Sequence, residues 1–266
     1  MGKIVIVASG KGGTGKTTVT SHIGAMLADM GHLTAVIDAD AGFRNLDIAL
    51  GMESSIVYDY SDYINGSADL DAILVKSSEL ENLYFVPAPQ SALTTDFDEE
   101  KTAELWNSLK NRFEFILADA PAGMGDGFMF AAKYADEGII VAAPETSSLR
   151  DADRVISELE DQNVETIRLV LNRVRPELIE QKVLMNADDC MDVLSIPILG
   201  IVPEDGAVTE SMAKGKPLLE ADGYGAGTAF KNIAERLLGS YVQMMSFDIN
   251  KKKSLREKIA DFFKRV

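Results

Sequence analysis

A segment suited to binding phosphate follows directly after the first apolar run of the chain. Residues 10–17 read Gly-Lys-Gly-Gly-Thr-Gly-Lys-Thr. Glycines let backbone N–H groups wrap phosphate oxygens at a helix N-terminus. Lys16 supplies a positive charge to the β- and γ-phosphates, and the Thr17 hydroxyl suits Mg²⁺. The sequence therefore predicts a site for ATP and Mg²⁺ formed by Gly10, Lys11, Gly12, Gly13, Thr14, Gly15, Lys16, Thr17 and Thr18.

Two further apolar runs each end at an aspartate. Run 33–38 ends at Asp38 with Asp40 just beyond it, and run 114–119 ends at Asp119. Open α/β sheets place catalytic groups at the carboxyl ends of their strands. We expect Asp38 and Asp119 to hold Mg²⁺, through water, together with Thr17, and Asp40 to orient the water that attacks the γ-phosphate. Asp38 and Asp40 could equally be a pair that caps the strand end, and an apolar strand closing on Asp is by itself common.

A second lysine, Lys11, lies inside the phosphate loop. Two lysines in one loop repel each other unless phosphate charge neutralises both. The stretch Lys11-Gly-Gly-Thr-Gly-Lys-Thr-Thr18 resembles the deviant Walker A box of the MinD/ParA family of ATPases. In that family the early lysine reaches the nucleotide of the partner subunit in an ATP-bound dimer. The resemblance therefore implies a homodimer, and it adds Lys11 to Lys16 and Asp40 as catalytic residues. The alternative is that Lys11 is a solvated loop lysine.

The resemblance extends over almost the whole chain and is strongest to the division-site ATPases of the family. Asp40-Ala-Gly-Phe-Arg-Asn-Leu-Asp47 is similar to their switch I, and Asp119-Ala-Pro-Ala-Gly123 to their switch II. Gly123, just beyond the strand that ends at Asp119, could donate its N–H to the γ-phosphate. The resemblance implies that Asn172 binds adenine. Pro203 and Asp205 would flank the base, although Pro-Glu-Asp also forms turns without a ligand.

One further stretch, 144–154, is similar to the helix start where the family binds its activator and inhibitor. The resemblance implies that Asp151 and Asp153 contact partners of the MinC/MinE type, while two acids at a helix start also favour the helix dipole. The chain departs from the family after Gly123. The acid usual in switch II is shifted by one residue to Asp126, between Gly125 and Gly127, which leaves the role of Asp126 open.

Short apolar runs alternate with helix-period segments, which predicts an α/β fold of the P-loop NTPase type. We expect a mostly parallel sheet of about seven or eight strands, with helices on both faces. The expected strands are 3–8, 33–38, 83–87, 114–119, 138–143, 166–172 and 197–202. The expected helices include 16–30, 98–111, 148–161, 178–193 and 226–239, the last ending at Gly239 as a C′ glycine.

Residues 251–266 predict a C-terminal amphipathic helix. Leu255, Ile259, Phe262, Phe263 and Val266 recur on one helix face, and Lys251, Lys252 and Lys253 precede them. A dozen helical residues span roughly 18 Å, too short to cross a bilayer but suited to an anionic membrane interface. The alternative is that this face packs on the protein's own core. We therefore expect an ATPase domain at 1–239, a linker at 240–250 and a membrane-targeting helix at 251–266.

Charge and cysteine content exclude several classes. The net charge is −16, and because 251–266 holds seven basic and two acidic residues, the first 250 carry −21. An acidic body repels nucleic acid, which argues against a DNA-partitioning role. The single cysteine, Cys190, excludes an intramolecular disulfide and the iron–sulfur relatives of this superfamily. With no secretory signal or membrane span in sight, we expect a cytoplasmic protein that binds the inner face of the cell membrane reversibly.

The resemblance thus implies an ATPase that dimerises on ATP, attaches to membrane and regulates division-septum placement by recruiting a septum inhibitor, with hydrolysis causing release. Two alternatives remain. A flagellar-number ATPase of the same family also carries a C-terminal membrane helix, but typically has an extension before its first strand. A nucleotide-gated membrane scaffold would share the site and hydrolyse little.

Overall fold

The computed structural model describes residues 1–42, 44–90, 97–221 and 223–245. Its strands are β1 Lys3–Ala8, β2 Thr34–Asp38, β3 Val75–Lys76, β4 Leu83–Val86, β5 Phe115–Asp119, β6 Glu137–Ala142, β7 Thr166–Val174 and β8 Ile198–Pro203. Its helices are α1 Lys16–Asp29, α2 Leu46–Leu50, α3 Tyr60–Ile64, α4 Leu70–Ile73, α5 Glu99–Arg112, α6 Asp126–Ala132, α7 Thr146–Asp161, α8 Pro176–Glu180, α9 Ala187–Leu194, α10 Gly206–Lys214 and α11 Ala226–Leu237, with a 3₁₀ turn, η1, at Glu53–Ser55.

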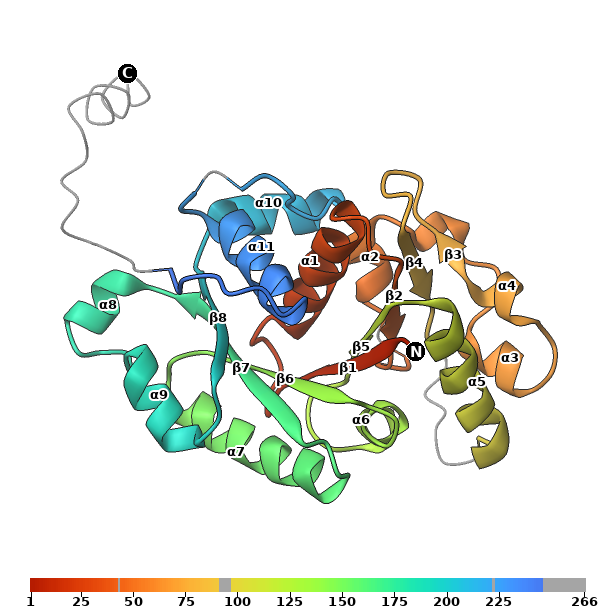
Figure 1. Cartoon of the computed structure of the whole chain (residues 1–266), viewed down its shortest axis with the longest axis horizontal. Coiled ribbons are helices and arrows are strands. Elements are labelled where there is room, and N and C mark those ends of the chain that lie inside the picture. The colour runs from red at the N-terminus through yellow and green to blue at the C-terminus, as the bar shows by residue number, and fades with distance from the viewer. Residues whose placement is uncertain (43, 91–96, 222, 246–266) are drawn as a thin grey trace.

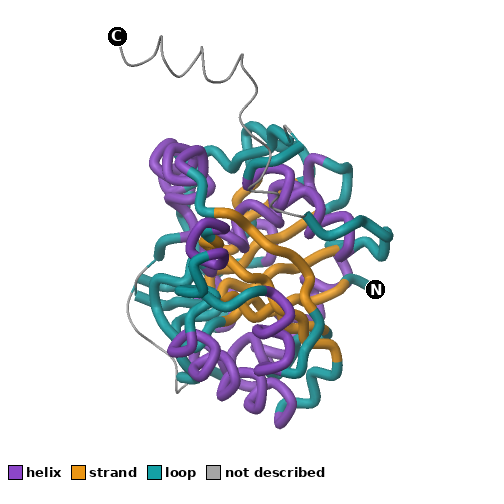
Figure 2. The backbone as a smooth tube through the Cα atoms, turned by 90° about the vertical axis from the view of Figure 1, so that its left-hand side faces the viewer, coloured by secondary structure: helices purple, strands orange, loops and turns teal. Residues whose placement is uncertain are grey.

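The strands form one sheet in the order β3-β4-β2-β5-β1-β6-β7-β8, parallel except for the antiparallel β3–β4 pair at one edge. Helices cover both faces (Figures 1 and 2). This confirms the predicted α/β fold. All seven predicted strands are present, and the eighth, β3, is a two-residue strand too short to show a periodic pattern. The strand β1 lies between β5 and β6, so the loop that follows it emerges at the centre of the sheet.

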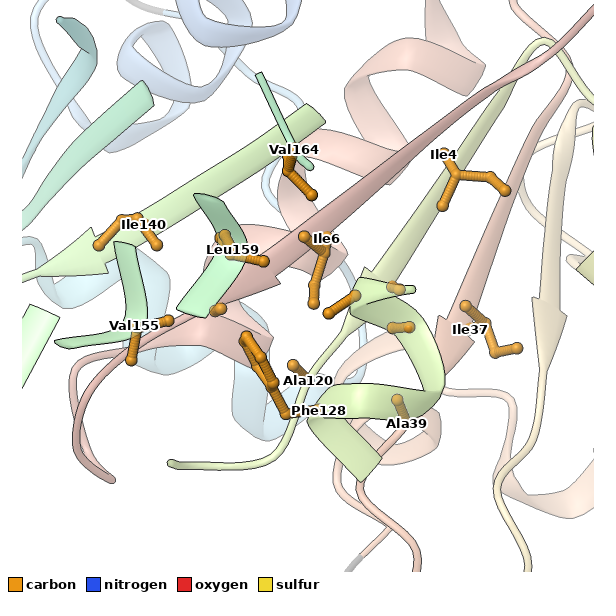
Figure 3. Packing of buried hydrophobic residues seen from close by; sticks show 14 of the residues in the cluster. Ile4, Ile6, Ile37, Ala39, Ala120, Phe128, Ile140, Val155, Leu159 and Val164 are labelled. Atoms are coloured by element: carbon orange, nitrogen blue, oxygen red, sulfur yellow. The ribbon is translucent and has the colours of Figure 1, made fainter. Parts of the chain in front are cut away.

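Alternate side chains of β1 enter two separate cores. Ile4 and Ile6 pack with α5, α6 and α7 on one face, and Val5 and Val7 with α1 and α11 on the other. Figure 3 shows the first of these cores, where Phe128 of α6 lies near Ala120 and Ala39 beyond the strand ends. Burial on both faces explains why the central strands read as continuous apolar runs. It also fixes the strand ends, and therefore the loops that carry the site.

One predicted helix is wrong. The segment 178–193 is two helices, because α8 ends at Glu180 and Lys182 follows with a left-handed φ of 58°. The second helix, α9, starts at a cap of its own, where the side chain of Asn186 accepts from the Asp189 N–H at 2.9 Å. A side-chain cap of this kind marks a helix start. Gly239, by contrast, is confirmed as the left-handed residue that follows α11.

The chain beyond α11 stays against the domain over the described residues. The Arg236 guanidinium donates to the carbonyls of Val242 and Gln243, at 3.1 and 2.9 Å, and to that of Leu199 in β8 at 2.8 Å. The first part of the predicted linker is thus held at the β8 edge. The predicted amphipathic helix at 251–266 lies outside the described residues. No helix among those that the structure describes is both long and apolar enough to span a bilayer.

Candidate functional site

The predicted phosphate loop joins β1 to α1. Gly13 and Gly15 have left-handed φ values of 82° and 93°, and Gly15 caps α1 without any side-chain hydrogen bond. The first-turn N–H groups of α1 therefore face the loop, as an anion site at a helix N-terminus requires. The loop is closely packed at Gly10, where a Cβ would lie 2.2 Å from the backbone carbon of Asp151, and open at Gly12 and Gly13, where a Cβ would have nothing within 4 Å.

Lys16 is a buried lysine beside two carboxylates. Burial lowers the pKa of its ammonium group, and the negative charges of Asp119 and Asp40 act in the opposite direction. This places a positive charge, with counter-charges already around it, at the first turn of α1. The predicted grouping of Lys16 with Asp40 and Asp119 is therefore present in the fold.

The two strand-end carboxylates are neighbours because β2 and β5 pair with Asp38 opposite Asp119. Asp119 accepts from the Thr17 hydroxyl at 2.6 Å and from the Thr20 hydroxyl at 3.1 Å. Asp38 accepts from the Asp40 N–H at 2.8 Å and from the Leu46 N–H at 3.4 Å. Burial, and then the charge of Asp119, raises the pKa of Asp38 to about 8. Burial raises the pKa of Asp119 to about 6, opposed by the Thr17 hydrogen bond.

This arrangement fits Mg²⁺ only when phosphate is also bound. Two buried, mutually repelling carboxylates and a hydroxyl favour a cation. However, no group of three or more His, Cys, Asp or Glu side chains that could hold a metal occurs in the described part of the chain. Mg²⁺ commonly binds through one or two carboxylates, several waters and substrate phosphates. Thr17, Asp38 and Asp119 match that incomplete set.

A cleft of about 350 Å³ opens beside the loop, where a base is expected. Its lining residues come from α1, β7, β8 and α10 and include Thr18, Asn172, Pro203, Asp205 and Met212. The structure thus brings together the three residues predicted at the base. The buried Asn172 amide donates to the Thr14 carbonyl at 2.8 Å, and a Cβ on Gly15 would lie 2.2 Å from its nitrogen. Asn172 therefore also supports the phosphate loop.

Asp205 has a structural role that the sequence reasoning missed. One carboxylate oxygen accepts from the Ala207 N–H at 2.9 Å and caps α10, and the other accepts from the Ala226 N–H at 3.0 Å at the start of α11. An Asp directly before a helical segment is the signal that could have found this cap. Contact between Asp205 and a base stays a prediction.

The switch II segment lies against the loop. The Gly123 N–H donates to the Ser9 carbonyl at 3.4 Å, so its donation to a γ-phosphate stays a prediction that requires this peptide to turn. The shifted acid, Asp126, is the first residue of α6. The adjacent Gly127 packs so closely that a Cβ there would lie 2.4 Å from the Ala39 carbonyl oxygen. The start of α6 thus packs against the loop that carries Asp40.

Lys11 is held toward the outside. Its ammonium group lies 3.2 Å from the Ser147 hydroxyl and 3.7 Å from the Glu145 carboxylate, at the start of α7. More than a third of its side chain is exposed. Of the predicted partner contacts on α7, Asp153 is exposed and Asp151 half-buried behind Gly10. One loop thus carries a buried lysine and a partly exposed one.

A family model described as the CobQ/CobB/MinD/ParA nucleotide binding domain matches residues 5–218. The chain belongs to the MinD/ParA family. It is 42% identical to the septum site-determining protein MinD of Synechocystis, over 93% of each chain. The solved MinC:MinD cell division protein complex of Aquifex aeolicus is 36% identical, with a TM-score of 0.85 over 92% of this chain and 98% of that one. MinD of Pyrococcus horikoshii, solved with Mg-ADP, is 30% identical, with a TM-score of 0.76 over 89% and 96%.

These matches confirm the resemblance inferred from the loop, and they support ATP-family nucleotides and Mg²⁺ as ligands of the MinD/ParA fold. His22 is a residue of this fold that the sequence reasoning did not single out. On α1, its Nδ1–H donates to the Thr18 carbonyl at 2.7 Å, which leaves Nε2 to accept from the Ser211 hydroxyl of α10 at 3.0 Å. Its ring stacks on Phe230 at 4.4 Å. His22 therefore joins the phosphate-loop helix to a helix that lines the base cleft.

We expect His22 to make the protein less stable in acid. Burial lowers the pKa of His22 from 6.5 to about 4. Between these values the unfolded chain binds the proton and the folded chain does not, so this contribution to stability is complete above pH 6.5 and is lost as the pH falls toward 4. Through His22 alone, the free energy of unfolding should fall by about 2 kcal/mol between pH 7 and pH 5.

Urea unfolding of the unaltered protein and of His22→Gln at both pH values measures this effect. Asp38 and Asp119 have raised pKa values, so their protonation makes the folded protein more stable as the pH falls, opposite to His22. The quantity to compare is therefore the difference in free energy of unfolding between the two proteins at each pH. The gap should narrow on acidification. A gap that stays constant would show that His22 does not titrate in this way.

Proposed function

We propose that this chain is an ATPase that dimerises on binding ATP, attaches to the membrane through residues 251–266 and regulates placement of the division septum. The observation that carries the proposal is the pair of lysines on one loop. Lys16 is buried beside Asp119 and Asp40, while Lys11 is presented outward by Ser147 and Glu145. A buried lysine suits the chain's own nucleotide, and an exposed one suits the nucleotide of a second subunit.

The residues of the site would divide the work of hydrolysis. Loop N–H groups and Lys16 would bind the β- and γ-phosphates, and Thr17, Asp38 and Asp119 would hold Mg²⁺. When bound, Mg²⁺ neutralises charge on the phosphate oxygens. Asp40, half-buried and close enough to Lys16 for their charges to interact, would orient the attacking water. Lys16 and the partner's Lys11 would stabilise the charge that develops on the γ-phosphate. Asn172, Pro203 and Asp205 would surround the adenine.

Comparison with relatives supports the cellular role. Curated relatives along the whole chain are named septum site-determining proteins, and a similar solved structure is a complex of MinD with MinC. We extend this to a septum inhibitor of the MinC type and an ATPase activator of the MinE type as partners, with Asp151 and Asp153 of α7 in contact with them. The acidic body, at −21 over the first 250 residues, is unsuited to nucleic acid.

Membrane attachment would respond to dimerisation. Each basic residue near an anionic surface contributes about 1 kcal/mol, and a partly buried apolar side chain about 1–2 kcal/mol. Ordering the helix costs roughly 1 kcal/mol or more for each residue. One copy of 251–266 would bind marginally, and two tethered copies far more tightly. Loss of the dimer after hydrolysis would return the protein to the cytoplasm.

Co-sedimentation with anionic liposomes tests this proposal. The full chain should sediment with ATP or a non-hydrolysable analogue and stay in the supernatant with ADP. The chain lacking residues 251–266 should stay in the supernatant with every nucleotide, and liposomes of neutral lipid serve as the control for the charge contribution. Sedimentation of the shortened chain would show that the tail is not the anchor. Equal sedimentation with ATP and ADP would show that nucleotide does not control attachment.

A further inference from the structure

Helix α10 has its first half in the base cleft. Asp205 caps its N-terminus, and Val208, Thr209 and Met212 line the cleft beside Asn172. The hydroxyl of Ser211 and the sulfur of Met212 also contact α1, through His22 at 3.0 Å and Ser21 at 3.9 Å. A nucleotide base bound in the cleft would therefore fix the position of α10.

The other end of α10 rests on α2, backbone against backbone. Each helix ends in a left-handed glycine, Gly51 after α2 with a φ of 65° and Gly215 after α10 with a φ of 61°. A Cβ on Gly51 would lie 2.6 Å from the Gly215 carbonyl oxygen. A Cβ on Gly215 would lie 2.7 Å from the Gly51 Cα and 2.9 Å from the Ile48 carbonyl oxygen. The two turns therefore meet through backbone atoms, and neither can move toward the other.

The opposite end of α2 reaches the predicted metal site. The Leu46 N–H, in the first turn of α2, donates to Asp38 Oδ2 at 3.4 Å. Leu46 and Leu50 of this five-residue helix are buried in the core beneath α1. One continuous path of backbone and buried contacts thus joins the base cleft to the carboxylate predicted to hold Mg²⁺.

We infer that α10 and α2 move as one rigid unit that couples recognition of the base to Mg²⁺ binding, with Gly51 and Gly215 as its positioning residues. The inference rests on the proposed nucleotide site. A base in the cleft fixes α10, the glycine contact fixes α2, and the Leu46 N–H then keeps Asp38 oriented. A Cβ between the two glycines displaces α2 from α10 and so shifts the Leu46 N–H relative to Asp38, while the Asp205 bonds to the Ala207 and Ala226 N–H groups still hold the start of α10 at the cleft.

Gly215→Ala tests this inference, with Gly239→Ala as its matched control. Both glycines follow a helix with left-handed φ, but a Cβ on Gly239 would have nothing within 4 Å. The measurement is the dissociation constant of ATP by calorimetry, with Mg²⁺ and with EDTA. In EDTA, the dissociation constant of Gly215→Ala for ATP should stay within about twofold of that of the unaltered protein. The factor by which Mg²⁺ tightens ATP binding should be at least about fivefold smaller in Gly215→Ala than in the unaltered protein. Gly239→Ala should keep both values.

A second pair guards against failure of Gly215→Ala to fold. Gly51→Ala enters the same contact from the α2 side, and Gly66→Ala, after α3 with a φ of 75° and open space around its Cβ, is its control. An equal loss of affinity with Mg²⁺ and with EDTA, or an equal loss in the controls, would overturn the inference. The inference would also be overturned if Mg²⁺ increased the ATP affinity of Gly215→Ala and Gly51→Ala as much as that of the unaltered protein. Absence of ATP binding by the unaltered protein would instead overturn the proposed function itself.

Discussion

Replacing Asp40 with alanine is expected to lower the rate of ATP hydrolysis about a hundredfold or more, while ATP affinity stays within about threefold. Burial raises the pKa of the Asp40 carboxyl, and the charge of Lys16 opposes this. A carboxylate so placed is a better base than an exposed one. Alanine removes it but keeps the Asp40 N–H, which donates to Asp38 at 2.8 Å and so keeps the predicted metal site oriented. Phosphate release at saturating ATP and calorimetric titration give the two quantities.

Asp188→Ala is the control, because it makes the same charge change at an exposed position on α9. It should leave turnover unchanged. Normal turnover in Asp40→Ala would remove the assigned role of Asp40. A parallel loss of ATP affinity would show that Asp40 holds the nucleotide rather than the water. Negligible turnover even in the unaltered protein would favour a nucleotide-gated scaffold over an enzyme.

Lys11→Ala should separate nucleotide binding from dimerisation. The ammonium group of Lys11 lies at the surface against Ser147 and Glu145, so its removal leaves Lys16 and the loop backbone in place. We expect ATP affinity of the monomer within about threefold of normal, loss of the ATP-dependent dimer, and turnover reduced at least about a thousandfold, as for other cations supplied in trans. Light scattering after size exclusion, with ATP and with ADP, measures the dimer.

Lys101→Ala, an exposed lysine paired with Glu104 on α5, is the control for loss of one surface charge. Lys16→Ala gives the contrasting pattern, since it should abolish ATP binding itself. A dimer that forms normally in Lys11→Ala would show that the two subunits meet through other contacts. Lys11 would then have no role in trans.

The fold and the chemistry of the loop could be predicted from sequence because both depend on local patterns. Apolar runs in alternation with helices specify a parallel sheet, and the residues after a strand are then known to lie at its carboxyl edge. The register that sets Asp38 beside Asp119 could not be predicted, since it depends on which strands become neighbours. The same holds for the Asn172 bond to Thr14 and for the contact between Gly51 and Gly215, which join residues more than a hundred positions apart.

Some features were missed although a local signal existed. Asn186 and Asp205 each precede a helix and cap it. The helical period alone merged the helix that Asn186 caps with the helix before it, and the family resemblance assigned Asp205 to the base. Periodicity averages over many residues, whereas a cap is a single hydrogen bond. A search for capping residues, made before helical periodicity is considered, would have located both helix starts.

The position of β1 in the middle of the sheet has a consequence for synthesis of the protein. Lys3 pairs with Phe115 and Val5 with Glu137. The strand β1 is synthesised first, and it cannot pair until β5 and β6, more than a hundred residues later in the chain, have been synthesised. At ribosomal speeds that interval is on the order of ten seconds. Until β5 and β6 emerge, β1 has neither of its neighbours in the sheet, and we expect the phosphate loop to lack the support that nucleotide binding requires. We therefore expect nucleotide binding only once about half of the chain has been made, since β6 ends at Ala142 of 266 residues, although the loop residues are among the first to leave the ribosome.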